Sequence, residues 1–267
     1  AQTKNLKKIM NAYIPRDDIP LSVGSNKSTA SDFSFDRSYI FTPNADKKIL
    51  FLGCSWTQGH SIASSEQAET NIDRLTAKIL SERLDKDVST VNLGVGGASF
   101  DYVTRMLILA YDHIKPDAVF FVIPGSDRKE YYRADGGVIR YQADWIHVAQ
   151  TQGPQWDMLD IISQDCFKLL IESSNNLDDA ISFFKNYKLA ESFLMTKEIP
   201  WGFSIVPAVN TRENFQTLQE MGWISSENYL GNEFNVFDTV SPEDGHPGIK
   251  SRTEFAKDIA HFFENKL

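Results

Sequence analysis

Three strongly apolar segments alternate with two amphipathic segments in the first half of the chain. The apolar segments are KILFLG (48–53), STVNLG (89–94) and DAVFFVIPG (117–125), and they predict buried strands, since a central parallel strand is apolar on both faces. The segments between them carry apolar residues at helical spacing: Ala68, Ile72, Leu75 and Ile79 in the first, and Tyr102, Val103, Met106, Leu107 and Ala110 in the second. This alternation predicts a parallel sheet with right-handed crossover connections.

An interruption follows the third strand. Residues 128–148 predict a hairpin or a loop with Gly136 and Gly137 at its turn. Two helical patterns come next, at residues 158–169 and 180–194. We expect this part to form an insertion rather than a continuation of the sheet.

Two further strands and a closing helix end the chain. WGFSIVP (201–207) resumes the sheet, and EFNVFD (233–238) predicts its last strand. Apolar residues striped over 255–263 predict the helix. The expected fold class is therefore α/β, with a central, mostly parallel sheet of five strands.

The predicted domain organisation has an N-terminal arm and one domain. Residues 1–47 are rich in Ser, Asn and Asp without a sustained period, and predict an irregular arm. Residues 48–267 form the α/β domain, with a partly helical insertion at about 128–198. Because ordered arms often dock on other proteins, a protein partner bound through the arm is an expectation.

Composition narrows the range of functions. The formal net charge is −9 and the sequence pI is about 5.1, which argues against nucleic acid or an anionic membrane as partner. We expect a soluble chain, because no segment has the length of a membrane span, and its first residues lack the apolar core of a signal peptide. The compartment stays open.

The sequence contains two cysteines, Cys54 and Cys166, which we expect to be free thiols, and its histidines lack metal-site spacing. We expect neither a metal nor another cofactor.

Small and polar residues follow the predicted strands. They read GCSWTQG (53–59), NLGVGGAS (92–99) and PGSDR (124–128), with SPEDGHPG (241–248) shortly before the closing helix. Each stretch alone is typical of a turn. Because ligands of open parallel sheets bind at the carboxyl ends of the strands, the four stretches are also candidates for one shared site.

In this order the four stretches resemble the blocks of the SGNH/GDSL hydrolase family. The first block is similar to Gly53–Gly59, the second to the NLGVGG turn with its glycine at Gly97, and the fourth to the segment that ends in His246 and Pro247. The third block resembles Gly125-Ser126-Asp127 only in part. The resemblance spans roughly residues 48–265 and implies a three-layer α/β sandwich of flavodoxin-like topology.

The resemblance also implies roles in acyl transfer. Ser55 would be the nucleophile and His246 the general base. Family spacing favours Glu243, three residues before the histidine, as the acid that orients it; Asp244, the more usual residue type, is the alternative. The oxyanion hole would comprise Ser55, Gly97 and Ser126.

Two departures from the family pattern concern the site directly. Cys54 replaces the usual aspartate, whose role in the family is mainly structural, and we expect its side chain to point into the core. Ser126 stands where the family has an asparagine, a donor to the oxyanion, and a hydroxyl is a shorter donor than an amide.

Further candidates flank the third block. Arg128 either forms a salt bridge with Asp127 or Glu130, or places a guanidinium near a substrate that bears a carboxylate, sulfate or phosphate. Trp56 and Asp127 join Arg128 as candidate substrate-binding residues.

The leading hypothesis is a serine hydrolase that removes a small acyl group from a carbohydrate or another small polar ester. The alternative is a catalytically weak or inactive module with the same fold, which serves binding or structure in a larger assembly. The replacement of the family asparagine by Ser126 and the long arm motivate this alternative.

Overall fold

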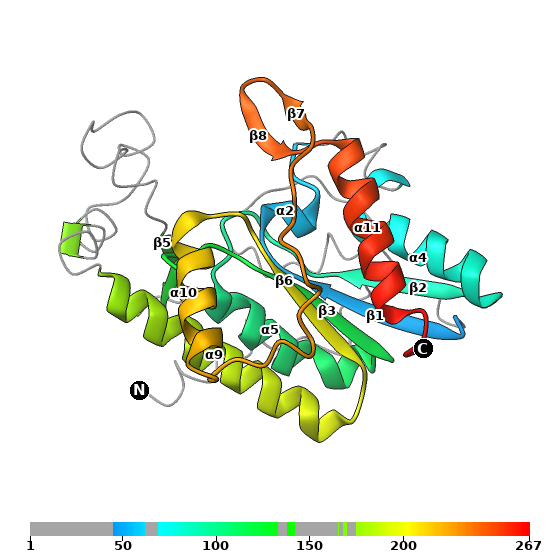
Figure 1. Ribbon diagram of the computed structural model, residues 1–267, viewed down its shortest axis with the longest axis horizontal. Coiled ribbons are helices and arrows are strands. Elements are labelled where there is room, and N and C mark those ends of the chain that lie inside the picture. Colours follow the sequence, from blue (N-terminus) through cyan, green and yellow to red (C-terminus); the bar gives the residue numbers. More distant parts are fainter. Residues whose placement is uncertain (1–44, 62–68, 133–137, 142–164, 166–167, 170–174) are drawn as a thin grey trace, which may run out of the picture.

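The computed structural model describes the chain except for residues 1–44, 62–68, 133–137, 142–164, 166–167 and 170–174. Four parallel strands form its main sheet in the order β2-β1-β3-β6, and two short antiparallel pairs, β4–β5 and β7–β8, accompany it (Figure 1). The elements in chain order are β1 (Lys47–Leu52), α2 (Ser55–Gln58), α4 (Ile72–Leu84), β2 (Val88–Asn92), α5 (Phe100–Ile114), β3 (Ala118–Ile123), β4 (Lys129–Tyr132), β5 (Val138–Tyr141), α9 (Asn176–Lys197), β6 (Trp201–Ile205), α10 (Val209–Glu220), β7 (Thr239–Ser241), β8 (Asp244–Pro247) and α11 (Ile249–Phe263).

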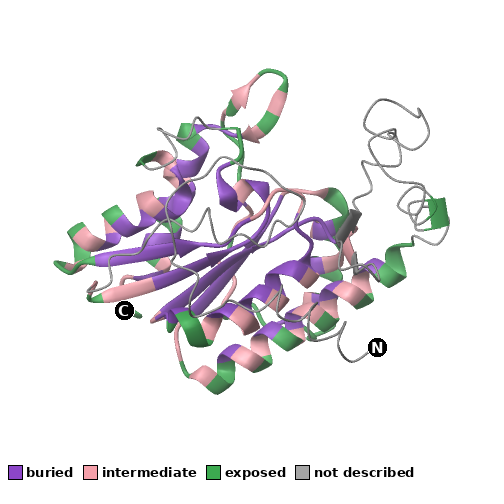
Figure 2. Cartoon of the chain, turned by 180° about the vertical axis from the view of Figure 1, so that it is seen from behind, coloured by how far each residue is buried: buried purple, intermediate pink, exposed green. Residues whose placement is uncertain are grey.

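The sheet lies between two layers of helices. Helices α4 and α11 pack on one face, while α5, α9 and α10 lie on the other (Figure 1). The strands of the main sheet are mostly buried and the helices turn their exposed residues outward, as Figure 2 shows. This is the three-layer α/β sandwich that the family resemblance implies, around the parallel sheet that the alternating pattern predicts.

Strand β3 shows why such a strand must be apolar on both faces. All six of its residues are buried, and successive side chains point to opposite sides of the sheet. The ring of Phe120 packs against Phe263 of α11, with centroids 6.3 Å apart, whereas the ring of Phe121 packs against Phe100 of α5 at 6.1 Å. The two helix layers are thus joined through neighbouring residues of one strand.

The expected fifth strand is absent from the described residues. Residues 233–238 form no strand, although the chain from Leu230 to Phe234 follows the edge of β6. Leu230 donates to the carbonyl of Phe203 (2.9 Å) and Phe234 to that of Ile205 (3.1 Å). Gly231 lies between these two contacts with φ of 90°, which interrupts an extended course. The prediction of a strand at 233–238 is therefore wrong, and in the described part of the chain the main sheet has four strands instead of the expected five.

Helix α10 was not predicted. Its buried face consists of Thr211, Phe215 and Leu218, so only two apolar side chains mark the helical period in a polar sequence. Tertiary contacts compensate for the weak pattern, since Phe215 packs edge-on against Phe203 of the sheet, with ring centroids 5.9 Å apart. The helix follows β6 directly and contributes to the site described below.

The insertion is described in part. Strands β4 and β5 form the antiparallel pair expected of a hairpin, while its predicted turn at Gly136 and Gly137 lies outside the described residues, as does most of the predicted helix at 158–169. The second predicted helix is present as α9. The N-terminal arm also lies outside the described residues, up to residue 44. Within the described part of the chain, no helix is both long enough and apolar enough to cross a membrane.

Candidate active site

Ser55 is the first residue of α2, which follows β1 after a two-residue turn. The turn is so tight that a Cβ atom on Gly53 would lie 2.1 Å from Thr57 Oγ1, which leaves no room for a side chain there. Cys54 is a fully buried free thiol, as expected, so its side chain lies in the core. Ser55 itself is 7% exposed. The sharp turn thus positions a serine at the carboxyl edge of the sheet.

Three hydrogen bonds hold the end of β2 and the loop after it against α2 and the turn before α2. Asn92 Nδ2 donates to the carbonyl of Thr57 (2.7 Å), the Gly96 amide donates to Gln58 Oε1 (2.8 Å), and the Val95 amide donates to the carbonyl of Gly53 (3.1 Å). Gly97 lies on this loop and is half-buried. The structure therefore brings the second sequence block beside the first.

A buried carboxylate, that of Asp73, accepts hydrogen bonds from strand β2 beside this loop. Asp73 of α4 is fully buried and accepts hydrogen bonds from Asn92 Nδ2 (2.9 Å) and Thr90 Oγ1 (3.0 Å). Burial raises the pKa of Asp73, and these two hydrogen bonds partly oppose the rise. Asn92 therefore links α2 to α4 through a single side chain.

His246 lies on β8, where it contacts an acid of the same strand. Its Nδ1 is 2.5 Å from Asp244 Oδ1, and its backbone amide donates to the same oxygen at 3.0 Å. A hydrogen bond from Ser61 is the main cause that holds the pKa of Asp244 well below its usual range. Desolvation opposes this effect but is smaller than the effect of Ser61, and the two hydrogen bonds from His246 lower the pKa further. The carboxylate is therefore ionised over the ordinary pH range.

The acid beside the imidazole is Asp244, where the sequence favoured Glu243. Glu243 is exposed in the turn before β8 and accepts a hydrogen bond from Ser241 Oγ (3.1 Å). Alternation along the strand explains the difference: Asp244 and His246 are two residues apart and share one face of β8.

Two contacts tie β8 to the end of α2. The rings of His60 and His246 lie 4.9 Å apart. Arg252 of α11 is fully buried and donates to the carbonyl of Pro247 (2.8 Å) and to that of His60 (3.2 Å), while burial lowers the pKa of its guanidinium to about 10. The strand that bears His246 is thus fixed beside the helix that starts with Ser55. In the described part of the chain, no hydrogen bond joins the Ser55 hydroxyl to the His246 ring.

Ser126 is buried at the end of β3 and bonded to α10. Its amide donates to Thr211 Oγ1 (2.9 Å), and its hydroxyl oxygen accepts from Asn214 Nδ2 (3.0 Å). The side-chain amide of Asn214 therefore lies beside Ser126, the position where the SGNH/GDSL family has an asparagine, but this amide comes from helix α10.

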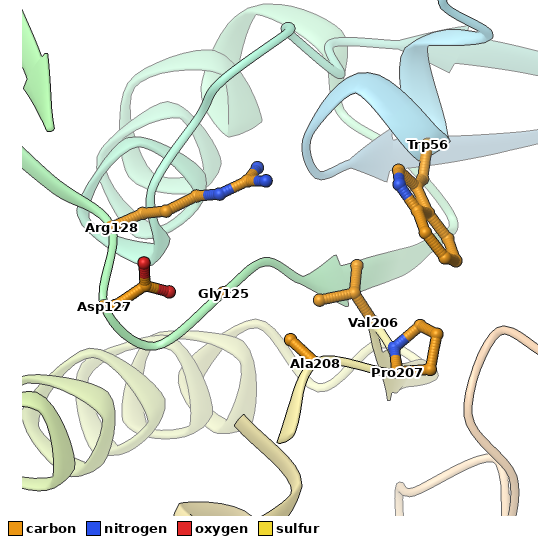
Figure 3. Close-up of a pocket in the computed structure, with 7 residues that line it drawn as sticks. All are labelled: Trp56, Gly125, Asp127, Arg128, Val206, Pro207 and Ala208. Carbon is orange, nitrogen blue, oxygen red and sulfur yellow. The ribbon is translucent and has the colours of Figure 1, made fainter. Parts of the chain in front are cut away.

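A cavity of about 180 Å³ opens at the carboxyl ends of β1, β3 and β6. Trp56, the residue after Ser55, lines it from one side, and its half-buried ring packs edge-on against Phe234, with centroids 5.3 Å apart. Asp127 and Arg128 line it from the other side, and the Arg128 side chain extends toward Trp56 (Figure 3). The three predicted substrate-binding residues thus share one cavity, whose full lining is Trp56, Gly125, Asp127, Arg128, Val206, Pro207 and Ala208.

The sequence did not reveal four residues that contact the site: His60, Ser61, Asn214 and Arg252. Asn214 depends on the unpredicted helix α10. Arg252 stands at a buried position of α11, where a sequence pattern leads one to expect an apolar residue. Their contacts join segments far apart in the chain, and no local spacing encodes them.

No family model matches the chain, and no curated protein matches it in sequence. Among solved structures, TesA matches with a TM-score of 0.49 and 10% identity, over 83% of this chain and 100% of that one. An Axe2 mutant, an acetylxylan esterase from Geobacillus stearothermophilus, matches at 0.46 and 14%, over 82% and 94%. A protein from Parabacteroides merdae described as a GDSL-like lipase also matches at 0.46 and 14%, over 83% and 95%.

At these identities the likeness concerns the course of the chain, and the function has to be inferred from the chain's own residues. Esterases and lipases, one of them described as GDSL-like, are among the solved structures that this chain resembles.

Proposed function

We propose that this protein is a serine hydrolase of carboxylic esters, with Ser55, His246 and Asp244 as its catalytic triad. The observation that carries the proposal is the 2.5 Å contact between Asp244 Oδ1 and His246 Nδ1, on a strand fixed beside the helix that begins with Ser55. An imidazole whose Nδ1 is held by a carboxylate keeps Nε2 available as a base.

The proposed reaction has two stages. His246 Nε2 takes the proton of Ser55 while Oγ attacks the acyl carbon, and the resulting tetrahedral intermediate expels the alcohol, which receives that proton. Water then attacks the acyl-enzyme with the same base and releases the acid. The backbone amides of Ser55 and Gly97 are the proposed oxyanion donors, with the Ser126 hydroxyl as third. The hydrogen bond from Ser55 to His246 would form with substrate bound, since catalytic hydrogen bonds are often long without it.

The substrate we propose is small and polar, such as an acetylated carbohydrate. The cavity lined by Trp56, the residue after Ser55, has a volume of about 180 Å³ and two charged lining residues, Asp127 and Arg128. Pockets for drug-sized ligands are typically about 300–1,000 Å³. The small, charged cavity supports a short polar group in preference to a long acyl chain.

Hydrolysis of 4-nitrophenyl acetate tests the proposal. We expect turnover by the wild type and a fall of at least about a thousandfold in kcat/KM for Ser55→Ala and for His246→Ala. Ser226→Ala is the matched control, because this exposed serine lies outside the site. Turnover that survives Ser55→Ala would refute the nucleophile. Absence of turnover of this and other short esters by the wild type would favour the binding module instead.

A further inference from the structure

The guanidinium of Arg128 has no protein partner in the described part of the chain. No hydrogen bond or ion pair engages it there, and its Nη1 is buried. Buried polar atoms without a partner are rare in native proteins, and leaving Nη1 without one costs free energy, although the Arg128 residue as a whole is only half-buried. A partner from outside the chain would remove this cost.

The neighbouring charges have other partners. Glu130, which the sequence allowed as a partner of Arg128, lies 2.8 Å from Arg105 Nη2. Lys129 contacts Asp178 and lies 3.2 Å from Asp179. The two charged residues that follow Arg128 are thus paired within the fold, and Arg128 differs from them.

The side chain of Arg128 points into the cavity described above. Its side chain extends into the cavity toward Trp56, away from the carboxylate of Asp127 (Figure 3). Val206, Pro207 and Ala208 line the same cavity and offer no charged side chain. A group bound there would meet the guanidinium at one end and would lie next to the residue that follows Ser55.

We propose that Arg128 binds an oxyanion of the substrate, so that the ester hydrolysed at Ser55 carries a carboxylate, phosphate or sulfate. A guanidinium can donate two parallel hydrogen bonds to such a group, and charge-assisted hydrogen bonds are about twice as strong as neutral ones. This inference rests on the proposed ester hydrolysis and adds the charge of the substrate to it.

Two isosteric esters test this specificity. 4-Acetoxybenzoate carries a carboxylate where 4-acetoxybenzamide carries a neutral amide, and rates of hydroxide hydrolysis correct for the different leaving groups. We expect the wild type to favour the carboxylate in kcat/KM by about 10- to 100-fold, the range of one charge-assisted hydrogen bond. The ratio should fall to near unity in Arg128→Gln. Arg212→Gln is the matched control: it removes the same charge from α10 outside the cavity lining, and should keep the wild-type ratio. A wild type without preference, or an Arg128→Gln variant that keeps it, would overturn the proposal.

A binding experiment separates this inference from the proposed function. Calorimetry on the Ser55→Ala protein, which needs no turnover, should give tighter binding of benzoate than of benzamide, and the difference should vanish in Ser55→Ala/Arg128→Gln. If the wild type hydrolyses neither ester while this difference is found, ester hydrolysis fails and the anion site stands. If benzoate binds no better than benzamide, the anion site fails, whatever the turnover. Phenyl phosphate and phenyl sulfate in the same titration identify the preferred oxyanion by its rank.

Discussion

Asp244 and His246 are two residues apart on β8, and the carboxylate of the first lies 2.5 Å from Nδ1 of the second. A strand places alternate side chains on one face, so this pair is fixed by the local backbone and needs no long-range folding to come together. What the rest of the fold contributes is the position of the pair beside α2.

The first prediction ranks the two acids. Asp244→Asn should lower kcat by about four orders of magnitude, because an amide stabilises the wrong imidazole tautomer and removes the charge that balances the imidazolium. Glu243→Gln, exposed and bonded to Ser241, should change kcat less than about threefold. Steady-state kinetics on 4-nitrophenyl acetate gives both values, and the opposite ranking would transfer the role to Glu243.

The second prediction concerns acid stability. Since the pKa of Asp244 lies below its usual value of 3.8 in the folded protein, this carboxylate contributes stability above that value and loses the contribution as the pH falls through the folded pKa. The free energy of unfolding of the wild type should therefore exceed that of Asp244→Asn by a margin that shrinks below about pH 4. Urea unfolding between about pH 3 and pH 7 measures the margin. A margin that grows toward acid would show that the carboxylate is not stabilised by its contacts.

The third prediction tests the link through Arg252. Arg252→Met removes the donor to the carbonyls of Pro247 and His60, at a cost of about 1–3 kcal/mol in unfolding free energy for each acceptor left buried without a partner. Ester hydrolysis should fall as well, because β8 and the end of α2 are no longer held together. Lys257→Met is the control, since Lys257 is exposed on the same helix and its side chain pairs with the exposed Glu254 carboxylate at 2.8 Å. Full activity in Arg252→Met would show that other contacts suffice to position His246.

The fourth prediction concerns the missing family asparagine. Ser126 is buried with Asn214 Nδ2 3.0 Å from its hydroxyl oxygen, so Ser126→Asn must displace that amide and should cost about 1–3 kcal/mol by overpacking. The exchange Ser126→Asn/Asn214→Ser restores the volume and should recover most of the loss. Urea unfolding of both single variants and the double variant gives the coupling energy. Additive losses would mean that the two side chains do not share this space.

Much of the fold could be predicted from the sequence. The strands β1, β2, β3 and β6 are short apolar runs whose burial on both faces leaves few alternatives, and α5 buries the apolar stripe that its period predicts. The prediction of a last strand at 233–238 was wrong because its apolar residues follow Gly231, whose positive φ interrupts the extended chain. Helix α10 was not predicted because only two of its three buried residues are apolar, too few to mark a helical period.

The sequence indicates those candidate site residues that stand in short sequence blocks, and does not indicate contacts between segments far apart in the chain. Ser55 and His246 were predicted from the resemblance of the sequence blocks to the SGNH/GDSL family, and the structure places them on neighbouring elements, α2 and β8. Asp244, and not the favoured Glu243, contacts the imidazole, because family spacing does not record which residues share one face of β8. The carbonyl contacts of Arg252 and the amide of Asn214 depend on the packing of helices, which no short stretch of sequence records.

Labelling with a fluorophosphonate tests the central claim most directly, because the probe reacts with a serine only when a base activates it. Intact mass spectrometry and peptide mapping of the labelled protein identify the modified residue. We predict one adduct per chain on the peptide that contains Ser55, absent in Ser55→Ala and strongly reduced in His246→Ala. An adduct on another serine, or an unlabelled wild type under conditions in which a known serine esterase reacts fully, would contradict the proposed catalytic triad.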